Sequence, residues 1–377
     1  MEFELTSDQK LFLSTARDFL EKEYPLDALR RAAQDERSGF DRGWWRRAAE
    51  LGWTSLLVPE ELGGGSISGH GVRDLALLAE QLGAGIAPGA LLPTNTVLAG
   101  LVAAHGTGPD HSDIIGELAS GEKVATWAVY EPGGQWAPLR PGLTATPTGD
   151  GGFRLDGTKD RVEAAPQADV LLVTAATPDG TAQFLVPAGA EGVSVTPQWG
   201  LDIARWFGTV QFDGVHVAAD AVVGAAGDEA AMERQFQIAL LIQCAEVCGG
   251  LTKVFDMTVQ WAFDRYSFGR PIASYQALKH RFADMRTWLE ACHATTGAAA
   301  AAVQENAENA AQLVSVAKSF VGERSLWILQ DCVQIHGGIG VTWEHDLHLF
   351  LRRATLDQSL YGTPDDHRRR LADLAGL

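Results

Sequence analysis

Residues 264–285 read DRYSFGRPIASYQALKHRFADM and lie in a helix-rich, apolar part of the chain. Gly269 and Pro271 interrupt helices, so this stretch predicts a helix, a tight turn and a second helix. Arg265 and Arg270 flank the predicted turn. Two guanidinium groups beside a reversing backbone have the chemistry to clamp a phosphate. Taken alone, the stretch is better explained as a helical hairpin that carries surface arginines.

Along the chain, the spacing of apolar and turn-forming residues changes near residue 121 and again near residue 226. The first part contains capped segments with helically spaced apolar residues, such as TSDQKLFLSTARDFLEKEY at 6–24. The middle part has short β-branched runs separated by Gly, Pro and Asp about every 8 to 12 residues, which is typical of a sandwich or barrel. In the last part, the Ala-rich run at 297–320 predicts one helix. The order is helices, then strands, then helices, which predicts an α+β protein.

Composition excludes several classes of function. The chain has 377 residues, of which 46% are hydrophobic, and a formal net charge of −18. Nucleic acids and anionic membranes select basic surfaces, so neither is an expected partner. No run of 18 apolar residues is present, so we expect no membrane span. A polyanionic ligand would need local arginines and backbone amides.

Cysteine usage and the first residues bear on the compartment. The four cysteines are Cys244, Cys248, Cys292 and Cys332. They lack a second close pair or a histidine cluster, so we expect no zinc site and no other metal. Buried free thiols suit a reducing cytosol. The acidic, polar stretch at 1–10 is not typical of a signal peptide, and we expect a cytoplasmic protein.

Three motifs resemble the acyl-CoA dehydrogenase family, and the order and length of the chain extend the resemblance over essentially its whole length. They are GWTSLLVPEELGGGS at 52–66, RYSFGRPIASYQALKHRFADM at 265–285 and QIHGGIGVTWEHDLHLFLRR at 334–353. The resemblance implies a helical N-terminal domain at 1–120, a central β-sandwich or barrel domain at 121–225, and a C-terminal four-helix bundle at 226–377.

The resemblance also implies FAD as the cofactor. The residues that would contact FAD are Arg265, Phe268, Gln276, Gln334, Gly337, Gly338 and Tyr130. Glycines let the backbone approach a diphosphate, and an arginine neutralises it. The alternative for Gly337 and Gly338 is a helix C-cap and turn. Because FAD bridges subunits in this family, the resemblance further implies a homotetramer, or a heterotetramer with a homologous chain.

The family needs a base that removes a proton from the substrate, and both usual positions lack a carboxylate here. Tyr361 of LYGT at 360–363 stands at one of them, and Ala239 stands at the other. A tyrosine, with an ordinary pKa near 10, is a poor base at neutral pH. Glu246 lies two helical turns beyond Ala239, among small apolar residues. Its sequence context resembles that of a branch of the family that acts on sterol side-chain thioesters, and this resemblance implies that Glu246 is the base. The alternative is a structural Glu246 paired with an Arg or Lys.

Several other positions depart from the family pattern. In VYEPGGQWAP at 129–138, Tyr130 replaces a threonine and Trp136 lies near the usual serine. In DRVEAAP at 160–166, Glu163 lies where a flavin-contacting side chain is usual, and we expect it to be a surface loop charge. We expect His336 to be packed or hydrogen-bonded and Asp357 to be a helix-surface charge.

The implied activity is FAD-dependent α,β-dehydrogenation of an acyl-CoA, or of an acyl thioester on a carrier protein, within lipid metabolism. Electrons would pass to an electron-transfer flavoprotein. Without carboxylates at Ala239 and Tyr361, we expect open space that favours a branched or ring-bearing acyl group. The alternatives are a flavin-dependent monooxygenase or amine oxidase of the same fold, and a non-catalytic subunit that completes a partner's FAD site.

Overall fold

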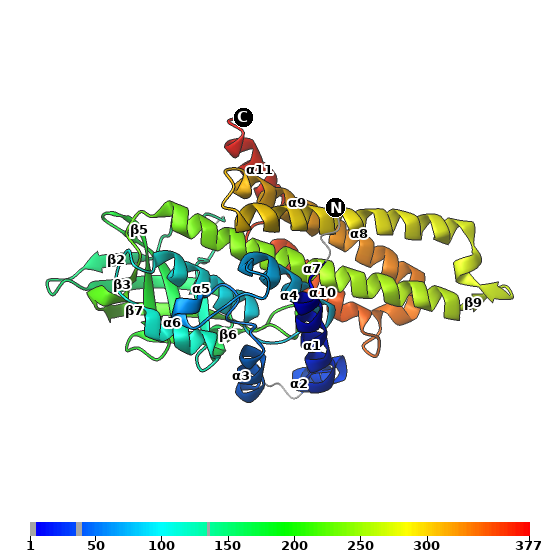
Figure 1. Cartoon of the computed structure of the whole chain (residues 1–377), viewed down its shortest axis with the longest axis horizontal. Helices are drawn as coiled ribbons and strands as arrows, with labels where there is room; N and C mark the ends of the chain where they lie inside the picture. The colour runs from blue at the N-terminus through cyan, green and yellow to red at the C-terminus, as the bar shows by residue number, and fades with distance from the viewer. Residues whose placement is uncertain (1–4, 35–39, 134–135) are drawn as a thin grey trace. The chain divides into compact units, whose positions relative to one another are not determined.

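The computed structural model describes residues 5–34, 40–133 and 136–377, and the structural statements below concern those residues. Helices come first, strands second and longer helices last, so the predicted order is confirmed (Figure 1). The helices are α1 (Ser7–Glu23), α2 (Leu26–Gln34), α3 (Arg42–Glu50), α4 (Gly71–Ala84), α5 (Leu91–Ala104), α6 (Ser112–Ala119), α7 (Glu229–Asp264), α8 (Gln276–Gln304), α9 (Ala310–His336), α10 (Leu347–Ser359) and α11 (Pro364–Leu374).

The central strands form one hydrogen-bonded mixed sheet. They are β1 (Ala125–Ala128), β2 (Thr144–Pro147), β3 (Phe153–Glu163), β4 (Val170–Thr177), β5 (Gly180–Pro187), β6 (Val193–Gln198), β7 (Phe207–Val217) and β8 (Val222–Val223). The order is β6-β7-β3-β2-β4-β5-β8, with β1 paired to β4. Both β1 and β2 run parallel to β4, whereas the other neighbours are antiparallel. The predicted β region is confirmed, and its strands pair into a single sheet.

The core of the sheet follows from its sequence pattern. Residues 170–175 of β4 are buried without interruption, as expected for a central strand covered on both faces. Leu171, Val173 and Ala175 share a buried cluster with side chains from other strands of the sheet, among them Leu155, Phe184 and Phe212. In β3, register shifts lie between Leu155 and Gly157 and between Lys159 and Val162, so the strand bends where it passes into the Arg161–Ala164 segment.

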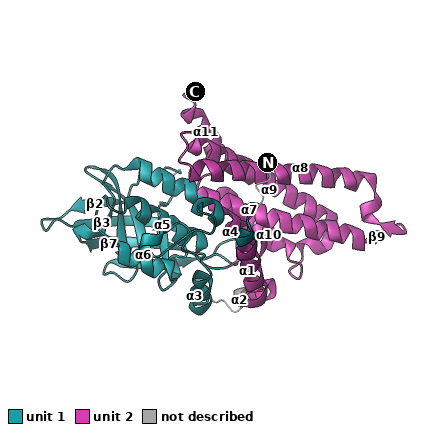
Figure 2. Ribbon diagram, viewed as in Figure 1, with its two compact units in different colours: residues 1–9, 31–75, 88–239 teal, residues 10–30, 76–87, 240–377 magenta. Residues whose placement is uncertain are grey.

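The chain divides into two compact units, shown in Figure 2. One unit contains residues 1–9, 31–75 and 88–239, including the sheet, and the other contains 10–30, 76–87 and 240–377. The boundary falls inside α7, and the N-terminal helices are shared between the units. The three-domain division at residues 120 and 225 stays a prediction.

The second unit contains the predicted C-terminal helical bundle, with one correction. The Ala-rich run at 297–320 is not one helix, because α8 ends at Gln304 and α9 begins at Ala310. Asn306 has a φ of 50°, a left-handed conformation that asparagine tolerates better than most residues. Alanine content favoured a continuous helix, but the asparagines favoured a reversal, which lets α8 and α9 pack as neighbours.

Helix α7 is the one described helix that is long and apolar enough to cross a membrane. Of its most apolar window of 18 residues, 83% is buried inside the protein. Burial of this kind is usual for the core helix of a soluble protein, where apolar residues surround the whole helix.

Candidate functional site

The stretch at 264–276 folds as a tight hairpin between α7 and α8. Two short strands, β9 (Tyr266–Ser267) and β10 (Arg270–Pro271), pair across Phe268 and Gly269. Phe268 has a φ of 51° and Gly269 a φ of 79°, which is the type I′ pattern of two-residue hairpins. The predicted helix, turn and helix are therefore confirmed, and Phe268 is 98% exposed at the tip.

The two arginines of this hairpin have different surroundings. The Arg270 guanidinium lies over the Tyr275 ring, 4.0 Å from its centroid. The Tyr275 hydroxyl in turn donates to the Ser267 carbonyl at 2.9 Å. Arg265 is exposed, and its backbone carbonyl accepts from the Ile272 amide at 2.8 Å. Both arginines are exposed, and Arg270 is in addition held against the Tyr275 ring.

The same end of the bundle carries most of the predicted cofactor contacts. Gln276 begins α8, next to the hairpin, and Gln334 lies in the last turn of α9. The end of α9 meets the end of α7, because the His336 ring stacks on Trp261 with centroids 5.3 Å apart. The structure therefore brings together these residues, all of them exposed: Arg265, Phe268, Gln276, Gln334, Gly337 and Gly338.

The two exposed glycines have different local roles. Gly337 has a φ of 68° and ends α9 as its C-cap, so the expected capping alternative is confirmed at this position. A Cβ added at Gly338 would meet nothing within 4 Å. Gly340, in contrast, packs tightly, since an added Cβ would lie 3.0 Å from the Cβ of His336. Open space at Gly338 leaves its backbone free for close approach by a ligand.

His336 is packed, as expected. It is 5% exposed, and its Nδ1 donates to the Cys332 carbonyl at 2.9 Å. Burial lowers the pKa of His336 below its usual value, although the hydrogen bond to Cys332 opposes this shift. A neutral ring stacked on Trp261 fits a structural role at the end of α9.

Tyr130, the remaining predicted cofactor contact, belongs to the sheet-containing unit. It is buried, its ring lies 4.9 Å from that of Trp136, and the Arg161 guanidinium lies 4.7 Å from its centroid. Trp136 in turn lies 5.1 Å from Phe236 of α7. Residues 134 and 135 of the same loop lie outside the described residues. Tyr130 is therefore one member of an aromatic cluster.

Glu163 is not a surface loop charge, and that expectation was wrong. It is 7% exposed and forms an ion pair with Arg205, which is 6% exposed, at 3.4 Å. The bulge in β3 turns the strand at Arg161, which has a φ of 49°, and directs the following residues into the sheet-containing unit. A carboxylate is retained inside protein when a cation pairs with it.

Glu246, the predicted base, lies in the buried middle of α7. It is 5% exposed, and Ala245 and Cys248 beside it are fully buried. Helix α4 crosses α7 here with backbone contact. A Cβ added at Gly83 would lie 1.9 Å from the Glu246 carbonyl oxygen, and one added at Gly249 would lie 1.8 Å from the Glu80 carbonyl oxygen. Glycines in both helices therefore allow the close approach around Glu246.

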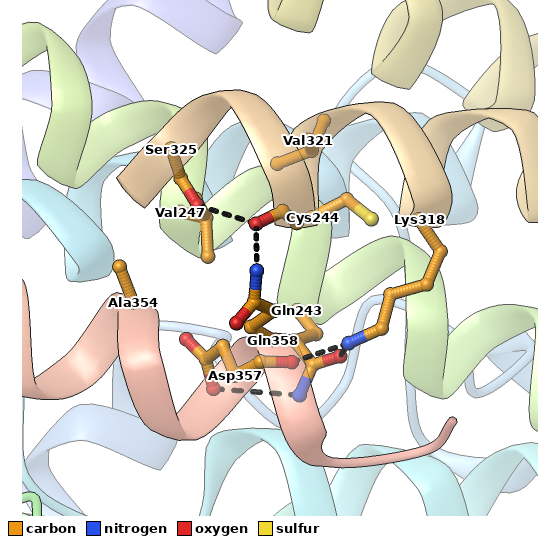
Figure 3. Close-up of a pocket in the computed structure, with 10 residues that line it drawn as sticks. Gln243, Cys244, Val247, Lys318, Val321, Ser325, Ala354, Asp357 and Gln358 are labelled. Atoms are coloured by element: carbon orange, nitrogen blue, oxygen red, sulfur yellow. Dashed lines mark hydrogen bonds between the residues drawn. The ribbon is translucent and has the colours of Figure 1, made fainter. Parts of the chain in front are cut away.

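A small pocket between α7, α9 and α10 has a polar corner, shown in Figure 3. Lys318, 2% exposed, donates from Nζ to the Gln243 side-chain oxygen and to the Asp357 carbonyl. Gln243 donates from Nε2 to the Asp357 carboxylate at 3.4 Å. Asp357 is 1% exposed, so our expectation of a helix-surface charge was wrong. The opposite wall is apolar and contains Val247, Val321 and Ala354.

Tyr361 is buried at 4% exposure, with a φ of 57°. The Tyr361 side chain is therefore packed inside the protein, and the open space expected for the acyl group stays a prediction. Ala239 is also fully buried. His367 of α11 donates from Nε2 to the Tyr361 carbonyl at 2.8 Å. Sequence reasoning did not single out Lys318, Gln243 or His367, and the one available signal was a lysine inside the apolar stretch 313–321.

The thiols and the metal-binding residue types complete the description. All four cysteines are free and buried. Within residues 5–34, 40–133 and 136–377, no group of three or more His, Cys, Asp or Glu side chains is placed to hold a metal ion. Burial raises the pKa of Cys244 and Cys292 to about 12 and that of Cys332 to about 11, so these thiols stay protonated at neutral pH.

The chain is similar to known proteins over most of its length. The family model described as "Acyl-CoA dehydrogenase, N-terminal domain" matches residues 6–122, and "Acyl-CoA dehydrogenase, C-terminal domain" matches 225–375. The chain is 30% identical over 372 residues to acyl-CoA dehydrogenase IpdE2 of Mycolicibacterium smegmatis, covering 97% of this chain and 98% of that protein.

Two solved structures are also similar. A variant of the Tcur3481-Tcur3483 steroid ACAD matches with a TM-score of 0.87 and 29% identity, covering 98% of this chain and 97% of that one. The ChsE4-ChsE5 complex from Mycobacterium tuberculosis matches with a TM-score of 0.86 and 28% identity, covering 100% and 99%. Both similarities extend over almost the whole chain.

The fold and the matched regions define a flavoprotein oxidoreductase with helical ends and a central mixed sheet. The chain belongs to the acyl-CoA dehydrogenase family. The predicted family, fold class and enzyme class are thereby confirmed, as is FAD as the cofactor that the family binds. Family membership also implies acyl-CoA dehydrogenation as the activity.

Proposed function

We propose that this enzyme removes hydrogens from Cα and Cβ of a bulky, ring-bearing acyl-CoA. Glu246 takes the Cα proton, and FAD accepts the hydride from Cβ. The proposal rests on two features of the helical bundle. Glu246 is a buried carboxylate inside it, and the exposed end of the bundle carries Arg265 and Gly338, which suit a diphosphate. The proposal extends the family's activity to named residues and a substrate class.

The bundle end fits the diphosphate of FAD. Arg265 is exposed and supplies a permanent cation, and nothing lies within 4 Å of a Cβ added at Gly338. Gln276 and Gln334 supply exposed amide groups for the sugar or phosphate oxygens. Phe268, exposed at the hairpin tip, offers a flat apolar surface to a ring. Tyr130, in the sheet-containing unit, stays a predicted cofactor contact.

Glu246 suits the role of base because of its position in α7. Glu246 is 5% exposed among small buried neighbours such as Ala245 and Cys248, so its carboxylate is largely withdrawn from water. A carboxylate within reach of a substrate carbon can act as the general base that takes its proton. The close crossing of α4 fixes the backbone at Glu246. FAD, when bound, supplies the hydride acceptor that a protein side chain cannot supply.

The substrate class follows from the relatives rather than from the pocket. One similar structure is described as a steroid ACAD, and the match covers nearly all of both chains. A fused-ring thioester is therefore the first class to test, on CoA rather than on a carrier protein. We extend the proposal to electron transfer from FAD to an electron-transfer flavoprotein. The cytoplasm is the proposed compartment, since four free thiols persist in reducing surroundings.

The proposed partner is a homologous chain in a heterotetramer. Phe268 is 98% exposed and Tyr266 is 63% exposed, on a hairpin that also carries Arg265. Exposed aromatic side chains next to a cofactor surface are typical of positions that a second subunit covers. A similar structure is itself a complex of two named chains, ChsE4 and ChsE5. Co-expression with a neighbouring homologue, followed by size measurement and FAD quantification, tests this part.

The central test is anaerobic titration of the FAD-loaded protein with a panel of ring-bearing and straight-chain acyl-CoAs. The wild-type flavin absorbance should bleach with the ring-bearing thioesters. Glu246→Gln keeps the shape of the side chain but removes its basicity, so the reduction rate should fall by about 10²–10⁴-fold. FAD content and thioester binding should stay near the wild-type values. Wild-type reduction rates in Glu246→Gln would contradict the assignment of the base.

A further inference from the structure

His293 of α8 contacts one side chain on each of two other helices. Its Nδ1 lies 3.3 Å from Oε1 of Glu80 in α4, and its Nε2 lies 2.9 Å from Oγ1 of Thr252 in α7. The His293 side chain is 29% exposed, so the ring is largely inside the protein. The three residues lie within 76–87 and 240–377, which belong to one compact unit (Figure 2). One ring therefore joins α4, α7 and α8.

The partners of His293 determine how many protons its ring carries. A carboxylate only accepts hydrogen bonds, so Nδ1 donates to Glu80. The Thr252 hydroxyl has a single proton, which it donates to the Cys248 carbonyl at 3.0 Å, the usual bond of a threonine within a helix. The Thr252 oxygen is then the acceptor for Nε2. A ring that donates from both nitrogens is an imidazolium, so these contacts select the charged form of His293.

The charged groups around His293 favour the same form. Burial lowers its pKa, but the hydrogen bond to Glu80 and the charge of that carboxylate outweigh burial, so the pKa lies above its ordinary value of 6.5. On α8 itself, Glu290 raises the pKa and Arg286 lowers it, and these two side chains pair with each other at 2.5 Å. On α7, the Cys248 thiol is neutral, because burial raises its pKa well above the usual range.

The contacts of His293 lie at the helix crossing that contains the proposed base. A Cβ added at Gly249 would lie 1.8 Å from the Glu80 carbonyl oxygen, so α4 touches α7 at the residue whose side chain binds His293. Three residues along α4, Gly83 touches Glu246, and an added Cβ there would lie 2.7 Å from the Glu246 Cα. A shift of α4 against α7 therefore acts directly on the backbone of Glu246.

From this arrangement we propose that His293 is a positioning residue for Glu246, and that its charged ring holds α4 on α7 at their crossing. The inference rests on the proposed function, because it concerns the base of that reaction. A neutral ring has one N–H in place of two and no charge to set against the Glu80 carboxylate, so it holds α4 less firmly. A small displacement of a catalytic group lowers the reaction rate steeply.

The test is the rate of flavin reduction in FAD-loaded protein by saturating decahydronaphthalene-carbonyl-CoA, measured in anaerobic single turnovers from pH 6 to pH 9. The wild-type rate should fall as the pH rises through the raised pKa of His293. His293→Arg keeps a cation at every pH in this range, so its rate should not show this fall. His293→Gln carries no charge, and its rate at pH 6 should be about 10- to 100-fold below that of wild type.

Two further variants separate positioning from general stability. Glu80→Gln removes the charge that raises the pKa of His293, so the rate should begin to fall at a lower pH than in wild type. Leu289→Ala, in the fully buried part of α8, should lower the melting temperature but leave the pH of the fall unchanged. A change in that pH by Leu289→Ala as large as that by Glu80→Gln would overturn the positioning role.

Hydrogen exchange gives a readout that needs no turnover. At one fixed pH near 6, backbone amides of residues 76–84 in α4 should exchange at least about tenfold faster in His293→Gln than in wild type or His293→Arg, because the crossing opens more often. Amides of β4, in the sheet-containing unit, should exchange equally in all three proteins and are the control. Equal exchange of α4 in the three proteins would show that the ring does not hold the crossing.

The possible failures are distinguishable. If the thioester reduces the wild-type flavin and the His293 variants keep the wild-type pH profile, the inference is wrong and the proposed function stands. If His293→Gln does not fold, a fall in rate that persists in His293→Arg equally overturns the inference. If no acyl-CoA reduces the flavin of FAD-loaded wild-type protein, the proposed function fails, and the role of His293 towards Glu246 fails with it.

Discussion

Gly83 of α4 lies directly against the backbone carbonyl of Glu246 in α7, so closely that a Cβ at Gly83 would be 1.9 Å from that oxygen. Gly249 repeats the contact in the other direction, against the carbonyl of Glu80. The pairs 83 with 246 and 80 with 249 show that the two helices run antiparallel. The backbone next to the proposed base is therefore held by a contact that only glycine permits.

Gly83→Ala should destabilise the protein by roughly 1–3 kcal/mol, because the added methyl group forces the two backbones apart. Chemical denaturation gives this free energy of unfolding. Gly297→Ala is the matched control, since Gly297 lies inside α8 and an added Cβ there meets nothing within 4 Å. The control should be more stable than wild type by about 0.5–1 kcal/mol. Equal stability of the two variants would contradict the close crossing.

Arg265→Ala should weaken FAD binding more than Arg270→Ala. Both side chains are exposed, but Arg270 is held against the Tyr275 ring, which restricts its reach towards a ligand. Loss of a charge-assisted hydrogen bond costs roughly 1.5–3 kcal/mol, which is about 10- to 100-fold in the dissociation constant. Fluorescence titration of the apoprotein with FAD measures the dissociation constants of both variants. Identical constants would show that Arg265 is not the preferred contact of the diphosphate.

Arg205→Met should destabilise the protein by roughly 3–5 kcal/mol, because it leaves the Glu163 carboxylate buried without the cation that pairs with it. Replacing both residues, as Glu163→Leu with Arg205→Met, should recover much of that loss. Thermal and denaturant unfolding of the two single variants and the double variant completes the cycle. Simple additivity of the two single effects would show that the ion pair is not coupled.

His367 should make the protein less stable in acid. Burial lowers the pKa of His367 to about 4 from its ordinary 6.5, so the unfolded chain binds a proton in this range and the folded chain does not. Above pH 6.5 the titration of His367 does not lower the free energy of unfolding. As the pH falls from 6.5 towards 4, that free energy decreases by up to roughly 3 kcal/mol. The free energy of unfolding measured from pH 8 to pH 4 should fall less steeply in His367→Leu. His280→Gln, at an exposed position, should follow the wild-type curve.

The fold was predictable where the deciding signals are local. Gly269 and Pro271 mark the hairpin within a few residues, and the structure places the reversal there. The Gly- and Asp-separated runs between 121 and 225 likewise became strands. The Ala-rich run at 297–320 failed because high helix propensity over most of it outweighed two asparagines in our reasoning. Asn306 adopts the left-handed conformation at the break, and summed helix propensity does not capture such a single position.

The site was predictable only in part, for a physical reason. Charged residues such as Glu163 and Asp357 have surface-like composition around them, and their burial depends on partners far along the chain. Arg205 neutralises Glu163, while Gln243 contacts Asp357 from α7. Lys318 and His367 donate to the carbonyls of Asp357 and Tyr361, which lie outside the helices that carry the two donors. No spacing rule within one segment identifies such partners.

The four buried cysteines are natural probes of how fast the folded chain opens. With their thiols shielded and held protonated, alkylating reagents should react with the native chain only as fast as it opens. The four sites lie on three helices of one bundle, α7, α8 and α9. Mass spectrometry would therefore follow the opening of each helix separately. A single cysteine introduced on the surface could be labelled with a dye while the native thiols are left in place.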